Sequence, residues 1–259
     1  MSLTLGGNIC IRNGFELDYC FQEAIQSLLP ICEEVVVCDG ESTDGTREAI
    51  EEWAAREPKI RLITYPWPNP KGDIKFWTDW INFAREQIKC DFQIQLDADE
   101  VLSENSYDWI KSYKHYTDSK AQESLWCKRW NFWRDAKSLI PFGHCLSDRV
   151  CRIAPQYCWL PSDGADVRGA DVIRIAQPSG IEIFHYGFLR KRESFFKKAR
   201  ALQEMFFNSY DPRLEEVEKQ DGNWMEKICE IEWTNQLTPF EGKHPVIMLQ
   251  WLKERNYTP

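Results

Sequence analysis

The chain has 259 residues, of which 43% are hydrophobic and 28% are charged, and its formal net charge is −9. A chain of this length can bury a core without disulfides or a structural metal, as one large α/β domain or two small ones. The acidic balance argues against general nucleic-acid binding, because phosphate backbones are held by clustered Lys and Arg side chains.

The cysteines and the hydropathy of the sequence indicate the cellular compartment in which we expect the protein. The ten cysteines form no C-x-x-C pair, and several stand in apolar runs such as EVVVCD. This pattern favours buried thiols over zinc ligands or disulfides. The start, MSLTLGGN, has no secretion-signal pattern, and no apolar run approaches the roughly 20 residues of a membrane span. We therefore expect a cytoplasmic protein without a transmembrane segment, and peripheral membrane contact stays open.

The first hundred residues alternate strand-like and helix-like segments. Because β-branched and apolar runs alternate with amphipathic ones, a mostly parallel sheet flanked by helices is predicted. Ligand sites of such sheets lie outside the carboxyl ends of the strands. Strands are expected at 4–12, 34–39, 59–65 and 92–99, and helices at 17–29, 45–57 and 74–88, with Asp44 as the N-cap of the second helix.

Beyond residue 102 the alternation loosens. We expect a helix to about residue 113, an aromatic strand at 124–133, a strand at 182–187, a basic helix at 190–207 and a short C-terminal helix. The aromatic strand carries Trp126, Trp130 and Trp133, which we expect on one face. They form either a platform that stacks on a ligand or a core layer.

Two carboxylates end the strand in FQIQLDADEVL. Asp97 and Asp99 are two residues apart, so in a strand they share a face. Two like charges in one patch raise a pKa or recruit a cation, and oxygen ligands suit Mg²⁺ or Mn²⁺. The alternative is a solvated pair or a cap on the next helix, although Ser103 is a better N-cap.

Two chemistries fit this pair. In the first, a metal bridges the diphosphate of a nucleotide-sugar and acts as a Lewis acid. In the second, Asp97 is a phosphoryl-accepting nucleophile and Asp99 the acid/base, because LDADEV also fits the pattern of haloacid-dehalogenase-like phosphatases. A full β-α repeat upstream favours the first. A third reading is a non-catalytic module that binds a nucleotide or carbohydrate.

The motifs VVVCDGESTDGT, INFA and IQLDADE, after a first strand that ends in Arg12 and Asn13, resemble glycosyltransferase family 2 over roughly residues 4–102. The resemblance implies a GT-A type nucleotide-sugar-binding fold. It implies a metal-dependent, inverting glycosyltransferase that moves a sugar from a nucleoside-diphosphate sugar to a hydroxyl of a glycan, lipid-linked or other acceptor. Among the donors, a UDP-sugar is favoured. Mn²⁺ or Mg²⁺ is the implied cofactor.

The resemblance also implies roles for individual residues. Asp97 would contact both ribose and metal, Asp99 the metal, and His185 in IFHYGFLR would complete the metal shell. A half-buried structural histidine is the alternative for His185. The remaining donor-binding candidates are Arg12, Asn13, Asp39, Ser42 and Arg190, the last of which would neutralise the leaving diphosphate unless it simply starts a solvated helix.

The catalytic base would deprotonate the acceptor hydroxyl. By resemblance it falls in WLPSDGADV, with Asp163 first and Asp166 second, although either could be a turn residue. His144 is a weaker candidate because no carboxylate partner is identifiable. Where the family often has Arg, this chain has Ile81, so the lost donor contact would come from Lys71, Lys75 or Arg85.

These implied roles divide the chain into three parts. They are a donor-binding half at 1–102, an acceptor-side half of the same domain at 103–192, and a helical C-terminal extension at 193–259.

Overall fold

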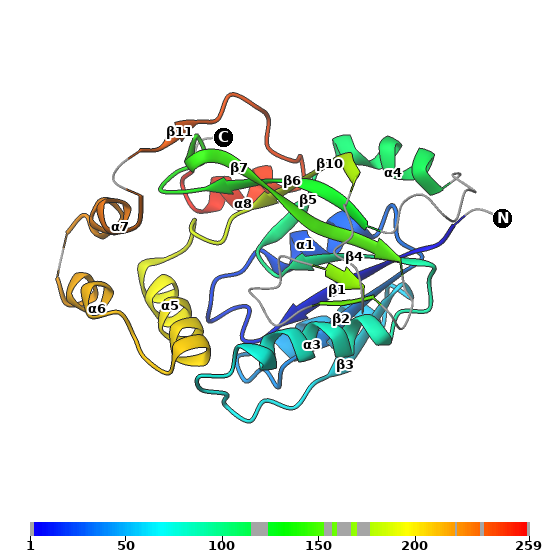
Figure 1. Cartoon of the computed structure of the whole chain (residues 1–259), viewed down its shortest axis with the longest axis horizontal. Helices are drawn as coiled ribbons and strands as arrows, with labels where there is room; N and C mark the ends of the chain where they lie inside the picture. The colour runs from blue at the N-terminus through cyan, green and yellow to red at the C-terminus, as the bar shows by residue number, and fades with distance from the viewer. Residues whose placement is uncertain are drawn as a thin grey trace.

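A computed structural model of the chain describes residues 3–114, 124–152, 157–159, 167–169, 177–220, 222–233 and 236–257. Within them, a nine-stranded sheet has the order β3-β2-β1-β4-β7-β6-β10-β5, and β11 pairs with β7 (Figure 1). The order β3-β2-β1-β4 places the strands of the first hundred residues side by side at one end of the sheet.

This first half of the sheet is entirely parallel. Its alternating side chains pack against helices on both faces: β1 turns Ile9 and Ile11 toward α1 and α2, and Cys10 toward α3. The elements are β1 (Leu5–Ile11), α1 (Phe21–Leu28), β2 (Glu34–Asp39), α2 (Thr46–Ala54), β3 (Ile60–Thr64), α3 (Ile74–Glu86) and β4 (Phe92–Asp97).

The second half mixes strand directions. β7 runs antiparallel to β4 and β6, whereas β10 is parallel to β6 and antiparallel to β5. Its elements are β5 (Glu100–Leu102), the 3-10 helix η1 (Glu104–Ser106), α4 (Tyr107–Lys114), β6 (Ser124–Phe132), β7 (Ser138–Arg152), β10 (Gln177–His185) and β11 (Thr238–Pro239), with a two-stranded sheet of β8 (Tyr157–Trp159) and β9 (Val167–Gly169).

The C-terminal helices are α5 (Arg192–Phe207), α6 (Pro212–Lys219), α7 (Trp224–Trp233) and α8 (Met248–Glu254). In Figure 1, α5, α6 and α7 lie on one side of the sheet, and α8 returns to β6 and β10. The buried face of α8 contributes Met248, Trp251 and Leu252 to the cluster around Phe132 and Tyr186. None of the helices in the described ranges is long and apolar enough to cross a membrane.

The predicted α/β fold class is confirmed, and the expected strands and helices of the first hundred residues are all present. One local prediction is wrong in its detail. The sequence GESTDGT puts Gly45, with φ of 92°, at the cap position of α2, so Asp44 stands one residue earlier. Its carboxylate accepts hydrogen bonds from the backbone of Thr46 at 3.1 Å and of Glu16 at 2.7 Å. The three-part division of the chain stays a prediction.

The prediction that the tryptophans share a face is also wrong. Trp130 packs against Phe240 at 5.3 Å between ring centroids, whereas Trp133 packs against Phe188 at 5.3 Å in a different cluster. Positions three apart point to opposite faces of a strand, and β6 ends before Trp133. The side chain of Trp126 lies outside the described part of the chain. Trp133 is therefore a core residue under α5 and α7.

Seven cysteines are described as free thiols, six of them buried, as the sequence predicts. The other three, at positions 145, 151 and 158, lie where side chains are not described.

A buried histidine ties the C-terminal segment to the sheet. His244 Nε2 lies 2.8 Å from the carbonyl oxygen of Ala136, and its Nδ1 lies 2.8 Å from the hydroxyl of Tyr186. Because a carbonyl only accepts, Nε2 carries the proton and Nδ1 accepts from Tyr186. Burial lowers the pKa of His244, so the ring is held neutral.

We therefore expect the free energy of unfolding to fall as the pH falls below about 6.5, where the unfolded chain protonates this ring and the folded chain does not. One such proton changes the free energy by at most about 1.4 kcal/mol per pH unit. Urea unfolding of the wild type and of His244→Asn at pH 7.5 and 5.5 measures the effect. The gap in stability between them should narrow at pH 5.5, and a gap that does not depend on pH would contradict this assignment.

Candidate functional site

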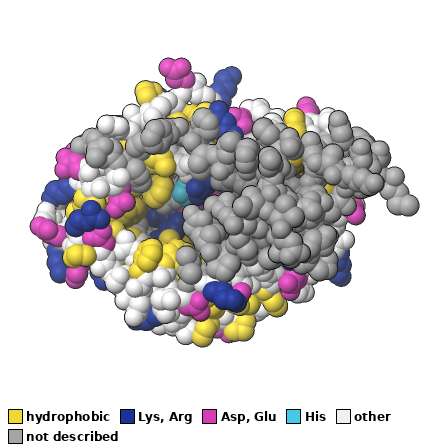
Figure 2. Space-filling model, in the orientation of Figure 1, with side chains coloured by type: hydrophobic (Ala, Val, Ile, Leu, Met, Phe, Trp, Pro, Cys, Tyr) yellow, Lys and Arg dark blue, Asp and Glu magenta, His cyan; other side chains and the backbone are white. Residues whose placement is uncertain are grey.

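The parallel strands bring two predicted carboxylates to the same edge of the sheet. Asp39 ends β2 beside Ile11, and Asp97 ends β4 beside Cys10, so both flank the end of β1, just before Arg12. Figure 2 shows a hollow on one face of the molecule. A histidine and Lys or Arg side chains are visible in it, and hydrophobic side chains surround it. The predicted donor and metal residues fall into two clusters at this edge.

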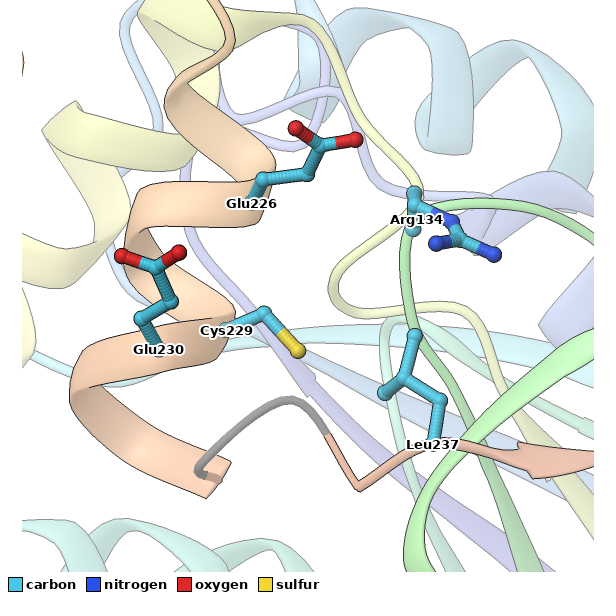
Figure 3. Close-up of a pocket in the computed structure, with 5 residues that line it drawn as sticks. All are labelled: Arg134, Glu226, Cys229, Glu230 and Leu237. Atoms are coloured by element: carbon cyan, nitrogen blue, oxygen red, sulfur yellow. The ribbon is translucent and has the colours of Figure 1, made fainter.

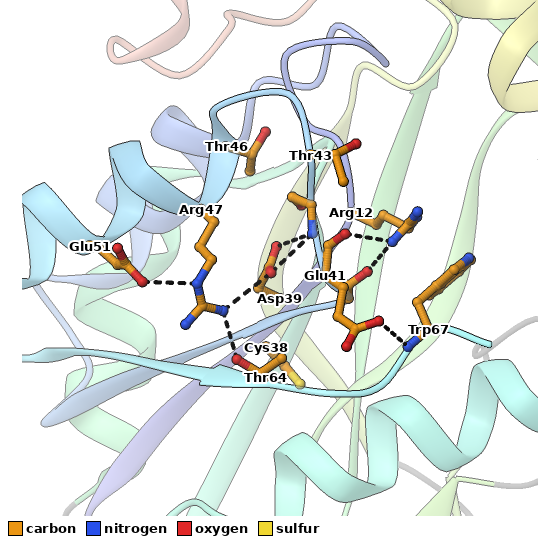
Figure 4. A network of polar contacts seen from close by, with 12 residues as sticks. Arg12, Cys38, Asp39, Glu41, Thr43, Thr46, Arg47, Glu51, Thr64 and Trp67 are labelled. Atoms are coloured by element: carbon orange, nitrogen blue, oxygen red, sulfur yellow. Dashed lines mark hydrogen bonds and ion pairs between the residues drawn. The ribbon is translucent and has the colours of Figure 1, made fainter. Parts of the chain in front are cut away.

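The first cluster surrounds Asp39, which is fully buried (Figure 4). Its two carboxylate oxygens lie 3.1 and 3.3 Å from the backbone nitrogen of Ser42, which donates to them. Arg47 Nη1 lies 3.5 Å from Asp39 Oδ2 and also donates to the Thr64 hydroxyl at 2.6 Å. The Asp39 carboxylate is thus held at the end of β2 and is paired with the Arg47 guanidinium.

Arg12 and Asn13 complete this cluster. Arg12 donates to the carbonyls of Gly40 and Glu41, and its guanidinium lies 4.8 Å from the centre of the Trp67 ring. Burial lowers the pKa of Arg12, against the effect of nearby carboxylates. Asn13, with φ of 49°, receives the Thr43 backbone N–H at 2.9 Å. Its own N–H donates to the Ser42 hydroxyl at 2.9 Å, so the four predicted residues form one unit.

The second cluster surrounds Asp99. The prediction that Asp97 and Asp99 share one face of a strand is wrong, because β4 ends at Asp97 and Asp99 lies in the turn between β4 and β5. Asp99 Oδ2 accepts hydrogen bonds at 2.6 Å from both Arg190 Nη2 and Lys198 Nζ, whereas Oδ1 lies 3.6 Å from His185 Nε2. The side chains of Asp99 and Arg190 are 4% and 1% exposed. Burial by itself would raise the pKa of Asp99, but the cations Lys198 and Arg190 hold that pKa well below its usual range. Asp99 is therefore ionised.

Arg190 is anchored by more than this carboxylate. Its Nε donates to the carbonyl of Gly187 and its Nη1 to the carbonyl of Leu17, each at 2.6 Å. The loop after β10 thereby packs onto the loop after β1. Gly187 lies directly against the second cluster, because a Cβ at this position would collide with His185 and stand 2.8 Å from Asp99 Oδ2.

Asp97 has a different environment. Its side chain is 25% exposed, its Oδ1 accepts from Gln95 Nε2 at 3.0 Å, and its Oδ2 lies 3.9 Å from Arg129. Arg129 also pairs with Glu100, a fully buried carboxylate that accepts the Asp97 backbone N–H at 2.9 Å. The following 3-10 helix is capped by Ser103, whose hydroxyl accepts from Asn105 at 3.3 Å, so neither aspartate is needed as its cap.

The second cluster partly fits a divalent cation. In the part of the chain that the structure describes, no three His, Cys, Asp or Glu side chains are placed to hold a metal. Asp99 Oδ1 and His185 Nε2, however, face each other at 3.6 Å, a spacing that one ion with bonds of about 2.1 Å to each can bridge. Burial, and next Arg129, lower the pKa of His185, so its ring is neutral as a ligand must be. The set of Asp97, Asp99 and His185 stays a prediction.

The base candidates Asp163 and Asp166 lie outside the described residues, as does the side chain of His144. The three cations predicted to replace the family arginine either form ion pairs with other carboxylates or are buried. Lys71 pairs with Glu204 and Lys75 with Asp79, whereas Arg85 is buried on α3.

Several residues of the site were missed by sequence reasoning. Each of them contacts a residue that the sequence does predict; they are Lys198, Arg129, Glu100, Arg47 and Trp67. For Lys198 a signal existed in the basic helix RKRESFFKKAR, but only the fold shows which lysine turns inward. A separate pocket of about 310 Å³ between α7 and the loop after β6 shares no residue with the two clusters (Figure 3); Arg134, Glu226, Cys229, Glu230 and Leu237 line it.

The fold is that of an α/β protein with polar side chains at the carboxyl ends of parallel strands, where such proteins bind nucleotides. The model of glycosyl transferase family 2 matches residues 17–109, a segment that contains Asp39, Asp97 and Asp99. The match confirms the resemblance to this family that the sequence motifs indicate. No curated protein matches the chain.

Similar solved structures include S. aureus TarS 1-349 in complex with UDP-GlcNAc, at 15% identity and a TM-score of 0.48, with 87% of this chain and 69% of that chain covered. Another is S. aureus TarS 1-349 itself, at 14% identity and 0.47, covering 87% and 68%. A third is the mannosyltransferase PcManGT from Pyrobaculum calidifontis in complex with GDP-Man and Mn²⁺, at 14% identity and 0.47, covering 89% and 70%.

Proposed function

We propose that the chain is an inverting glycosyltransferase that transfers a sugar from a nucleoside-diphosphate sugar to a hydroxyl of a glycan or lipid-linked acceptor. UDP-sugars are the favoured donor class. The observation that carries this proposal is the family match over residues 17–109 together with the two clusters at one sheet edge. One cluster offers a buried carboxylate, and the other offers cations beside an ionised aspartate.

The nucleoside would bind at the first cluster. The Asp39 carboxylate can accept from a ribose hydroxyl or from a uracil N–H, because an ionised carboxylate has several acceptor sites. Its backbone partner, Ser42, holds it in place. The planar Arg12 guanidinium, already packed on Trp67, is a surface on which a base can stack.

The diphosphate would bind at the second cluster. Asp97, Asp99 and His185 would hold Mn²⁺ or Mg²⁺, and the bound ion would act as a Lewis acid for the leaving nucleoside diphosphate. Arg190 and Lys198 would stabilise the negative charge that develops on the leaving group. Asp163, or Asp166, would take the proton from the attacking hydroxyl on the opposite side of the sugar, which gives inversion.

The test is the release of nucleoside diphosphate from a panel of UDP-, GDP- and dTDP-sugars with Mn²⁺, with and without candidate acceptors. We expect turnover of one donor class and its loss on chelation. Turnover of p-nitrophenyl phosphate instead would favour the phosphatase alternative, and binding without turnover would favour a binding module. Absence of both binding and turnover with every donor would contradict the proposal.

Asp39→Asn is expected to weaken binding of the matching nucleoside diphosphate by roughly 10- to 100-fold, since a hydrogen bond to a charged group contributes about 1.5–3 kcal/mol. The amide oxygen can still accept from Ser42, so the loop should keep its shape. Calorimetric titration measures the change. Glu51→Gln is the matched control, because Glu51 pairs with Arg47 at 2.9 Å but does not contact Asp39 in the network of Figure 4. Equal affinity in wild type and Asp39→Asn would remove Asp39 from the donor site.

A further inference from the structure

Six charged side chains form two ion-paired groups at this edge of the sheet, one around Arg129 and the other around Asp99. Three are carboxylates and three are cations, so their formal charges cancel without any metal. They are Asp97, Asp99, Glu100, Arg129, Arg190 and Lys198. Glu100 and Asp99 are 0% and 4% exposed, and charges this buried must be compensated by one another or by a ligand.

This balance constrains what can enter. A divalent cation alone would leave uncompensated positive charge, and a diphosphate alone would leave uncompensated negative charge. When a divalent cation and a diphosphate bind together, their opposite charges compensate each other. The carboxylate that a metal would need, Asp99, already carries Arg190 and Lys198 on its Oδ2. A metal on Oδ1, the oxygen that faces His185, would bring its positive charge close to both cations, and the move of one of them to the diphosphate would lower that repulsion.

The two cations are held differently. Arg190 is fixed by the carbonyls of Gly187 and Leu17 in addition to Asp99. For Lys198, Asp99 is its one hydrogen-bond acceptor among the described residues. Its side chain is 20% exposed, so solvent reaches part of it. A lysine is a compact charge on a flexible stem with rotatable donors, which suits it to change partners.

We propose that Lys198 is an exchangeable counter-ion: it neutralises Asp99 in the empty site and moves to the diphosphate when the metal takes Asp99. This inference rests on the proposed function and adds a residue to it. It makes Lys198 a competitor of the metal and a ligand of the nucleotide. Removing its charge should therefore act on the two ligands in opposite directions.

The experiment measures the two ligands separately. Binding of Mn²⁺ alone is followed by the electron paramagnetic resonance signal of the free ion, and binding of UDP, or of GDP if UDP does not bind, by calorimetry at saturating Mn²⁺. In Lys198→Met, Mn²⁺ should bind about tenfold more tightly and the nucleotide about tenfold more weakly than in wild type. Lys198→Arg, which keeps the charge, should stay close to wild type in both.

Lys197→Met is the matched control. Lys197 is the preceding residue of α5, is 57% exposed and pairs with Glu16 at 2.7 Å, so its loss should leave both affinities unchanged. A general loss of structure in Lys198→Met would weaken both ligands, and that result, or no change in either, would overturn the inference while leaving the proposed function intact. A wild-type protein that binds no nucleoside diphosphate would overturn the proposed function and the inference with it.

Discussion

Replacing Asp99 by Asn is expected to lower the rate of sugar transfer by about a thousandfold or more and to destabilise the fold by about 3–5 kcal/mol. The activity falls because the metal and the two cations lose their common carboxylate. The stability falls because Arg190 and Lys198 are left near each other without compensation, and breaking a buried ion pair by removing one partner costs this much. Donor-dependent release of nucleoside diphosphate and urea unfolding at pH 7 measure the two effects.

The pH dependence of this second effect has a definite sign. The pKa of Asp99 is held well below its usual range in the folded protein, so the stability it contributes is present above pH about 4 and is lost as the pH falls below that value. The difference between wild type and Asp99→Asn should therefore shrink on acidification. Asp79→Asn is the control, since Asp79 forms an exposed pair with Lys75 that contributes about 1 kcal/mol or less. An Asp99→Asn variant as stable as this control would contradict the account.

Gly187→Ala is expected to reduce transfer by about a hundredfold. The added methyl would collide with His185 and approach Asp99 Oδ2 to 2.8 Å, so both side chains must shift from the positions that face each other. Displacements of this kind in a catalytic group commonly cost about this factor. The same assay, together with Mn²⁺ binding, measures the loss.

Gly180→Ala is the matched control for this prediction. Gly180 lies in β10, and a Cβ there would stand 2.7 Å from the Trp109 ring, away from both clusters. It should destabilise the protein with little effect on donor binding or turnover per folded molecule. If Gly187→Ala showed the same pattern, the close approach of Gly187 would concern packing alone.

The first half of the molecule could be predicted from the sequence because its information is local. Apolar alternation marks the strands, and strand ends in a parallel sheet meet at one edge, so Asp39 and Asp97 were expected there. The contact of Ser42 with Asp39 is also local, three residues along the chain. These features require only the period of a strand and the direction of the sheet.

The second cluster depends on contacts between distant segments. Asp99 meets Lys198 across 99 positions, and Arg190 meets the loop at Leu17 across 173. No local pattern distinguishes Lys198, which turns to Asp99, from Lys197, which faces Glu16. Arg190 was expected as a diphosphate ligand, but its role in holding Asp99 and two loop carbonyls follows only from the packing of the chain after β10.

A crystal structure of the protein with a nucleoside-diphosphate sugar and Mn²⁺ tests the central claim most directly. The account predicts the base beside Asp39 and the diphosphate within hydrogen-bond distance of Lys198 and Arg190, with the metal on Asp99. A nucleotide seated elsewhere, for example in the pocket lined by Arg134 and Cys229, with the bond between Lys198 and Asp99 unchanged, would contradict it.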